Sequence, residues 1–223
     1  MVGFAQARRT MVDGQVRTSD VTDLRLLQAM LDVPRERFVN PAQAAVAYLD
    51  QDIAIMAGAG GHSPRYLLKP MVLAKLIQAA EIGASDHVLD VGCASGYSAA
   101  LLARLADRVL ALEESPILAE AAAKVLHDLQ AGNVTVVTAV LADGWPASAP
   151  YDVILLEGAS EIVPRKLFPQ LKDGGRLLCV HGRGPVKKAM LYRSAGGEVS
   201  GRPIFDAAAA VLPGFVEPPI FVF

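Results

Sequence analysis

The sequence predicts a doubly wound α/β fold, in which helices cover a mostly parallel sheet, with a helical extension on its N-terminal side. Three observations lead to this prediction. From residue 87 onward, short apolar or β-branched runs alternate with helix-like segments. A turn that contains glycines directly follows the first of these runs. The chain of 223 residues is 52% hydrophobic and 20% charged, which is enough for one core without disulfides.

The first part of the chain predicts helices and a loop. Residues 21–31 carry apolar side chains at helical spacing, and helical periodicity returns over residues 70–82. Residues 56–64 form a glycine-rich stretch with no packing pattern, which indicates a loop. We expect residues 1–82 to form the helical extension with this loop, and residues 83–223 to form the α/β domain. The two parts are expected to pack as one compact unit.

Five runs from residue 87 onward predict the strands of the sheet. Each run is continuous rather than alternating, as expected of strands that are buried on both faces of a parallel sheet. Ser115 and Pro116 suit the cap and first turn of the helix after the second run. Further strands are expected in the tail at residues 190–192 and 220–223. The five runs are residues 88–91, 109–112, 134–138, 153–156 and 176–180.

Charge and composition argue against several classes of function. The formal net charge is −2 and the basic residues are scattered, so no nucleic-acid partner is expected. Two cysteines and four separated histidines lack metal-ligand spacing, so no metal is expected. No apolar run is long enough to span a membrane, and the N-terminus lacks the apolar segment of a signal peptide. We expect a soluble, cytoplasmic protein without a membrane partner, and the oligomeric state is unknown from the sequence.

Residues 88–96 (VLDVGCASG) have the form of a ligand-binding turn at the end of a first strand. Gly92 and Gly96 allow the backbone to approach a ligand closely, because a Cβ atom would clash. Glu113 ends the next strand about twenty residues later, where a carboxylate binds the two hydroxyls of a ribose. The alternative is that the two glycines only make a tight turn between a strand and a helix.

Details of this turn favour S-adenosylmethionine over a dinucleotide. Binding of an NAD-type pyrophosphate uses G-x-G-x-x-G, but Ala94 and Tyr97 stand at the second and third glycine positions. S-adenosylmethionine has no phosphate, and Asp90 suits its ammonium group directly or through water. The residues expected to bind this cofactor here are Asp90, Gly92, Ala94, Gly96 and Glu113.

Several stretches of the chain match one known family. The longest is VLDVGCASGYSAALLARL with LALEE behind it, and the less generic MVDGQV and VPRERFV lie in the N-terminal part. In these stretches the chain resembles the protein-L-isoaspartate O-methyltransferases. The resemblance implies a Rossmann-like methyltransferase that uses S-adenosylmethionine to methylate the carboxylate of L-isoaspartyl residues in damaged proteins. It also implies a protein or peptide substrate, and a substrate loop within residues 1–82.

The chain departs from the family on the acceptor side. Family members carry a Thr-Ile-Ser segment shortly before a proline, and its hydroxyl faces the reacting carboxylate. Counted back from the first strand, that proline is Pro70, so Tyr-Leu-Leu at residues 66–68 replaces the segment. Counted forward from the N-terminal part, the segment falls at His62 and Ser63, because the loop is longer here. The resemblance therefore leaves Ser63 and Tyr66 as alternative residues of the catalytic site.

Two other departures concern the adenine and the end of the fourth strand. The family has Gly-Asp-Gly after the third strand, and its Asp binds the adenine amino group. Residues 139–141 are Ala-Val-Leu, so the backbone groups of Val140 and Leu141 are left to contact the adenine. Glu157 stands where the family usually has Thr. A carboxylate there repels an anionic acceptor or serves as a base toward a neutral nucleophile.

Three hypotheses for the function stay open. The first is isoaspartyl methylation, which needs little acid–base chemistry because the attacking carboxylate is already ionised at neutral pH. The second keeps the cofactor but changes the acceptor, since residues 66–68 and Glu157 differ from the family. The third is a non-catalytic cofactor-binding relative, motivated by residues 139–141. Arg65 and Lys69 are candidates for attracting a substrate carboxylate, although charges in a loop are expected to be solvated.

Overall fold

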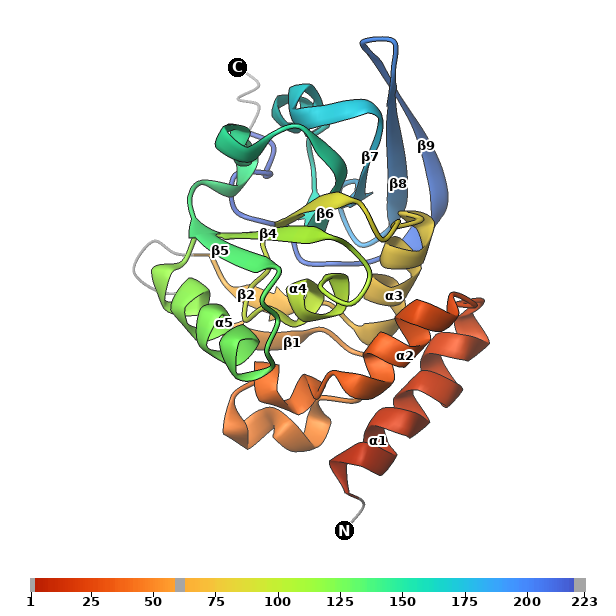
Figure 1. The fold of residues 1–223 in the computed structure, drawn as a ribbon, viewed down its shortest axis with the longest axis vertical. Coiled ribbons are helices and arrows are strands. Elements are labelled where there is room, and N and C mark those ends of the chain that lie inside the picture. The colour runs from red at the N-terminus through yellow and green to blue at the C-terminus, as the bar shows by residue number, and fades with distance from the viewer. Residues whose placement is uncertain (1–2, 59–62, 219–223) are drawn as a thin grey trace.

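The computed structural model describes residues 3–58 and 63–218. A seven-stranded sheet crosses its centre in the order β5-β4-β3-β6-β7-β8-β9 (Figure 1). The pairs from β5 to β7 are parallel, and β8 and β9 add two antiparallel strands at one edge. This confirms the predicted doubly wound, mostly parallel sheet. Its strands are β3 (His87–Val91), β4 (Arg108–Glu113), β5 (Val134–Thr138), β6 (Tyr151–Ser160), β7 (Leu171–His181), β8 (Lys187–Ala195) and β9 (Glu198–Ala207).

The chain enters this sheet in the middle. From β3 it moves outward to β4 and β5, then returns past β3 to β6 and continues outward on the other side. The strand order therefore reverses between β3 and β6. Ligands of open α/β sheets bind outside the carboxyl ends of the strands at this point. The turn at residues 92–96 follows β3 directly and lies there.

Three helices cover one face of the sheet. They are α3 (Pro70–Ala79), α4 (Tyr97–Leu102) and α5 (Pro116–Asp128), and they share one hydrophobic core with Val88 of β3. The predicted cap of α5 is present, because the hydroxyl of Ser115 accepts a hydrogen bond from the backbone of Leu118.

The opposite face of the sheet has a different cover. Leu89 of β3 belongs to a second core, which is closed by the short 3-10 turns η5 (Leu141–Asp143) and η7 (Arg165–Gln170) and by the segment 208–217. A third turn, η6 (Pro146–Ser148), lies between η5 and β6. The segment 208–217 follows the last strand and crosses the carboxyl end of β6.

The N-terminal part packs outside α3 and α4. Helix α2 contacts both, and α1 lies beside α2 on the outer side (Figure 1). Arg35 anchors this part, since its buried guanidinium donates to the backbone oxygens of Ala47 and Leu68 and lies over the ring of Tyr97. The elements are α1 (Phe4–Met11), η1 (Val12–Val16), η2 (Arg17–Ser19), α2 (Leu24–Asp32), η3 (Arg35–Phe38), η4 (Pro41–Val46), β1 (Ile53–Met56) and β2 (Arg65–Leu67).

Some elements differ from the sequence-based prediction. The helices expected at residues 21–31 and 70–82 are present as α2 and α3, and the antiparallel pair of β1 and β2, which was not predicted, flanks the expected loop. Strand β9 was not predicted, because most of its side chains are exposed and no apolar run marks it. The strand expected at residues 220–223 lies outside the described residues.

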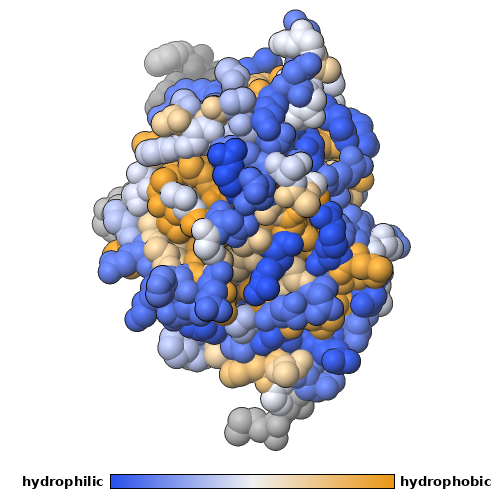
Figure 2. All heavy atoms as spheres, in the orientation of Figure 1, coloured by the Kyte–Doolittle hydropathy of each residue, from blue (hydrophilic) through white to orange (hydrophobic). Residues whose placement is uncertain are grey.

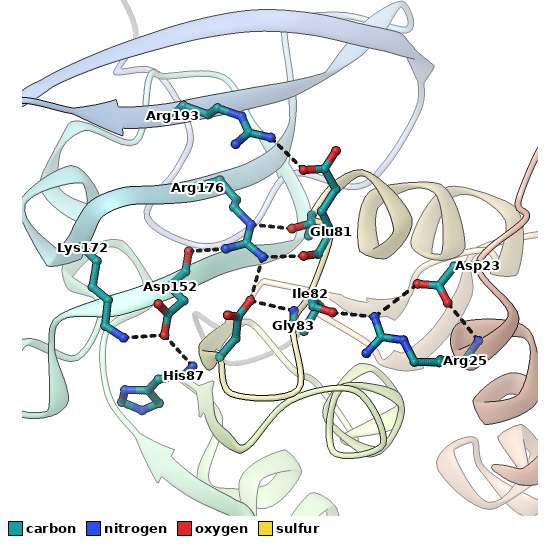
Figure 3. A network of polar contacts seen from close by, with 12 residues as sticks. Asp23, Arg25, Glu81, Ile82, Gly83, His87, Asp152, Lys172, Arg176 and Arg193 are labelled. Atoms are coloured by element: carbon teal, nitrogen blue, oxygen red, sulfur yellow. Dashed lines mark hydrogen bonds and ion pairs between the residues drawn. The ribbon is translucent and has the colours of Figure 1, made fainter.

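A polar network joins the amino ends of the strands to α3 (Figure 3). Arg176 of β7 is its centre, and all three of its side-chain nitrogens donate: to the backbone oxygens of Ala80, Glu81 and Asp152, and to the carboxylate of Asp86. On the face shown in Figure 2, polar and apolar residues are interspersed. Within residues 3–58 and 63–218, no helix is long and apolar enough to cross a membrane.

Candidate functional site

The turn after β3 takes a backbone path that favours glycine. Gly92, Ala94 and Gly96 all have positive φ angles, of 79°, 54° and 94°. A Cβ atom on Gly96 would lie 3.1 Å from the Cβ of Ala122, so this glycine lets α5 pack against the turn. A Cβ atom on Gly92 would lie 3.1 Å from Nη2 of Arg65 and 3.0 Å from a methyl group of Leu212. Gly96 thus has a packing role, and Gly92 faces the space where a ligand is expected.

Glu113, at the carboxyl end of β4, is fully buried and accepts four hydrogen bonds. Three come from backbone amides: Ala94 at 2.8 Å, Glu114 at 2.9 Å and Ser115 at 3.1 Å. The fourth comes from Nη2 of Arg65 at 2.8 Å. The predicted ribose-binding carboxylate is therefore next to the turn, with each of its oxygens accepting two hydrogen bonds.

Asp90 on β3 points toward α4 and is fully buried. Its Oδ2 accepts a hydrogen bond of 2.7 Å from the hydroxyl of Ser98, while its Oδ1 has no partner among the described residues. The pKa of the Asp90 carboxyl is raised to about 7: burial and the negative charge of Glu113 raise it, and the hydrogen bond from Ser98 and the charge of Arg65 oppose this. One free carboxyl oxygen thus remains for a cationic group.

Glu157 lies on β6 beside Asp90 in sheet order and is buried. Burial raises the pKa of its carboxyl well above the ordinary value, the charge of Asp90 adds to this, and Arg35 and Arg65 oppose it. Its Oε1 has no hydrogen-bond partner within the described part of the chain. The raised pKa favours the neutral form of Glu157, and a neutral carboxyl offers a donor as well as an acceptor.

The other predicted residues on the acceptor side lie at two small cavities. Tyr66 of β2 is half-buried and lines a cavity of about 10 Å³ together with Glu157. Ser63 is exposed and lines a cavity of about 180 Å³ together with Glu113. His62, the neighbour of Ser63 in the alternative alignment, lies outside the described residues.

The two residues expected at the adenine differ in position. Val140, directly before η5, is half exposed, whereas Leu141 is fully buried in the second core. Leu141 can therefore offer a ligand only its backbone, as the sequence indicated. Asp143 is exposed and pairs with Lys166 on the surface.

Arg65 contradicts the expectation of a solvated loop charge. It lies on β2 and is only 3% exposed, and its Nη2 donates to the carboxylate of Glu113 and, at 2.9 Å, to the backbone oxygen of Gly92. Its Nε and Nη1 have no partner among residues 3–58 and 63–218. No local pattern could reveal this, because the two partners lie far from Arg65 in the sequence. Lys69 is half-buried and precedes α3.

Leu212, in the segment 208–217, lies on the other side of the turn. The segment is held by the edge of β6: the amide of Ala159 donates to Ala210 at 2.7 Å, and that of Leu212 donates back to Ala159 at 2.9 Å. A Cβ atom on Gly158 would lie 2.7 Å from Cγ of Leu212, so only a glycine at that position leaves room for it.

These contacts test whether S-adenosylmethionine fits. The acceptor atoms suit it, since Asp90 has a free oxygen and Glu113 lies beside the turn. The space does not, because Arg65 and Leu212 lie over Gly92 and the cavities of about 10 and 180 Å³ are below the roughly 300 Å³ of typical ligand pockets. In this arrangement the cofactor fits only if both side chains move.

Metal chemistry finds no support in the same region. Among the described residues, no group of three or more His, Cys, Asp or Glu side chains is arranged to hold a metal ion. Cys93 and Cys179 are buried free thiols, and burial raises the pKa of each.

Comparison with known proteins places the chain in a family. A sequence model described as Protein-L-isoaspartate(D-aspartate) O-methyltransferase matches residues 6–205. The protein-L-isoaspartate O-methyltransferase of Koribacter versatilis is 34% identical over 214 residues, which cover 96% of this chain and 94% of that protein.

Solved structures share the fold. A protein-L-isoaspartate O-methyltransferase structure superposes with a TM-score of 0.79 at 24% identity, covering 93% of this chain and 66% of the other. A Plasmodium falciparum structure in complex with S-adenosyl-L-homocysteine superposes with a TM-score of 0.77 at 16% identity, covering 92% and 97%. From the match of the family over residues 6–205 and the relative of nearly equal length, the chain belongs to the protein-L-isoaspartate(D-aspartate) O-methyltransferase family.

Proposed function

We propose that this protein is an S-adenosylmethionine-dependent O-methyltransferase that methylates the carboxylate of L-isoaspartyl residues in damaged proteins or peptides. The observation that carries the proposal is the family match, which spans residues 6–205 and so includes the N-terminal extension as well as the cofactor turn. The extension matters because the turn alone occurs in methyltransferases with many acceptors.

The residues at the turn have distinct roles in this proposal. Asp90 holds the ammonium group of the cofactor through its free Oδ1, and Glu113 accepts a hydrogen bond from a ribose hydroxyl once Arg65 has left it. Gly92 allows the close approach, and the backbone of Val140 and Leu141 borders the adenine. When bound, the cofactor supplies a methyl group that its sulfonium already activates.

The acceptor side needs alignment more than acid–base chemistry. An isoaspartyl carboxylate is ionised at neutral pH, so the protein must orient it and exclude water. Glu157 does not repel such an anion when it is protonated, and burial favours the protonated form by raising its pKa. Tyr66 and Ser63 remain predicted members of this side.

The proposal is tested by transfer of labelled methyl to an isoaspartyl peptide, with its normal aspartyl isomer as the control peptide. We expect a base-labile methyl ester on the isoaspartyl peptide alone, and its loss in Glu113→Ala. Glu120→Gln is the matched variant, since Glu120 is an exposed acid on α5. Complete absence of the ester with the unchanged protein would refute the substrate assignment.

A second candidate is a methyltransferase with a different acceptor or a non-catalytic relative. The contact of Arg65 with Glu113 and the lack of a side-chain carboxylate at residue 140 favour it. Calorimetry with S-adenosylhomocysteine separates these cases. Binding with methylation of another group indicates a different acceptor, and binding without turnover on any acceptor indicates the non-catalytic relative.

The proposal also covers the cellular location, the partners and the domain organisation of the enzyme. We place it in the cytoplasm, without nucleic-acid or membrane partners, and its free thiols Cys93 and Cys179 are compatible with a reducing compartment. We also treat residues 1–82 and 83–223 as one compact unit. The contacts of Arg35 with Tyr97 and of Arg176 with Glu81 cross that boundary and support this.

A further inference from the structure

We propose that Arg65 and Leu212 form an internal plug, which competes with the cofactor for the turn at Gly92. This inference rests on the proposed function and adds a regulation of the same site. In the closed form the two side chains cover the turn from two elements far apart in the sequence, β2 and the segment 208–217. The cofactor binds only to the form in which both have moved away.

The acceptor positions of the Glu113 carboxylate are limited. A carboxylate has about four acceptor positions, and all four are taken here. Three belong to the amides of Ala94, Glu114 and Ser115, which the backbone of the turn and the start of α5 fix in place. Arg65 therefore holds the one acceptor position that a ribose hydroxyl can gain. Arginine and ribose cannot both have it.

The space at the turn is also occupied in the closed form. A Cβ atom on Gly92 would meet Nη2 of Arg65 at 3.1 Å and Leu212 at 3.0 Å, so the volume that this glycine leaves open is already filled. Beside Arg65 and Glu157, the remaining cavity of about 10 Å³ holds about one water molecule. A ligand of nucleoside size must displace the plug.

The residues around Arg65 and Leu212 accommodate each of these side chains. Gly158 accommodates Leu212, because a Cβ atom there would lie 2.7 Å from Cγ of Leu212. Two backbone hydrogen bonds between Ala159 and the segment 208–217 fix the height of Leu212 above the turn. Arg65 lies between the carboxylate of Glu113 and the backbone oxygen of Gly92 and donates to both.

Two features of the closed form favour release of the plug. Nε and Nη1 of Arg65 are buried and find no partner in the part of the chain that is described, and buried donors without acceptors oppose the closed form. The segment 208–217 is joined to β6 through a single isolated bridge, Ala159 with Val211, rather than through a full strand pairing. Opening exposes the buried side chain of Leu212 and breaks the backbone hydrogen bonds that hold this segment, and it returns the unpaired donors of Arg65 to water.

Calorimetric titration of the full chain with S-adenosylhomocysteine tests the plug. We expect Leu212→Ala and Arg65→Gln each to bind about ten-fold more tightly than the unchanged protein, as removal of a dominant closed state requires. The matched variants are Leu167→Ala, a buried leucine of the same core, and Arg176→Gln, an arginine with a 12% exposed side chain at the other end of the sheet. Neither should tighten binding, because neither touches the turn.

Amide hydrogen exchange of the unchanged protein gives a second test that needs no variant. Saturating S-adenosylhomocysteine should speed the exchange of the amides of Ala159 and Leu212, whose hydrogen bonds break when the segment leaves. The amide of Leu178 in β7 serves as the internal reference and should not exchange faster.

The outcomes separate the plug from the proposed function. Tight binding by the unchanged protein, no gain in the two variants and unchanged exchange would overturn the plug while methyl transfer stands. Binding by no form of the protein, together with no methyl transfer, would overturn both the function and the competition. Tighter binding in both variants with faster exchange supports the plug.

Discussion

Two arginines with little exposed surface lie at opposite ends of the same sheet and differ in how their hydrogen-bond donors are paired. Arg176, at the amino ends of the strands, donates from all three side-chain nitrogens (Figure 3). Arg65, at the carboxyl ends, donates from Nη2 only, and its other two nitrogens have no partner among the described residues. Arg176 is 12% exposed and Arg65 is 3% exposed, so the less satisfied arginine is also the more buried one.

The difference indicates which end of the sheet is a scaffold and which is a site. Fully paired polar groups fix a structure, whereas unpaired buried groups are costly and are kept where a ligand or a conformational change will pair them. Two carboxyl oxygens at the same end, Oδ1 of Asp90 and Oε1 of Glu157, also have no hydrogen-bond partner among the described residues. The amino end is scaffold, and the carboxyl end is the site.

The largest effect that tests this comparison is expected for Glu113→Ala. This change leaves the guanidinium of Arg65 buried without its carboxylate, which should lower the free energy of unfolding by about 3–5 kcal/mol. Urea denaturation followed by circular dichroism measures it. The double variant Glu113→Ala with Arg65→Gln should recover part of the loss. A double variant that is no more stable than Glu113→Ala would show that the buried charge is not the cause.

Arg176→Ala should have the next largest effect. It removes four hydrogen bonds at the amino end and leaves Asp86 without its cation, so we expect a loss of about 2–3 kcal/mol in the free energy of unfolding. Affinity for S-adenosylhomocysteine, measured by calorimetry on the folded variant, should stay within about two-fold. A large loss of affinity would contradict the division into scaffold and site.

A smaller effect concerns the pH dependence of stability. Folding raises the pKa of Asp90 from 3.8 to about 7, chiefly through burial, with Glu113 adding and Ser98 and Arg65 opposing. The folded protein then binds a proton that the unfolded chain has lost, so stability should fall as the pH rises from about 4 to 7 and level off above.

Asp90→Asn removes this titration. Between pH 5 and pH 8, the difference in unfolding free energy between the variant and the unchanged protein should shift by about 2 kcal/mol in favour of the variant. Denaturation at both pH values measures it, with exposed Asp173→Asn as the control. Equal pH profiles for Asp90→Asn and the unchanged protein would refute a neutral, buried Asp90.

The smallest effect is expected for Gly158→Ala. The added Cβ atom would meet Leu212 at 2.7 Å, so we expect a loss of about 1 kcal/mol and a displaced leucine. Gly174→Ala is the control for the added methyl group, since its Cβ would meet no described atom within 4 Å. Its positive φ adds backbone strain to the control. Cofactor affinity should rise in the first variant only.

The sequence predicts the parts of this site that depend on local order. The glycine turn, the position of Glu113 at the end of β4 and the cap at Ser115 follow from short patterns, and all are present. Whether these residues bind the cofactor stays a prediction. The contact of the Leu141 backbone with the adenine likewise stays a prediction.

The parts that the sequence does not predict depend on partners far away in the chain. Arg65 looks like a solvated charge because its burial is decided by Glu113, and Leu212 lies in a tail without periodicity. Strand β9 pairs at an exposed edge, so it needs no apolar run. Packing between distant segments, rather than local preference, decides each of these cases.

Leu212 follows Gly92 by 120 residues in the sequence, and this separation sets an order of events during synthesis. The ribosome completes the turn at residues 92–96 and its partner Glu113 long before it reaches the segment 208–217. A domain that folds as it emerges therefore passes through a stage in which the sheet is largely built and the turn still lacks its leucine cover. At that stage Arg65 can already cover the turn and Leu212 cannot, so the plug is completed only when the segment 208–217 packs against β6.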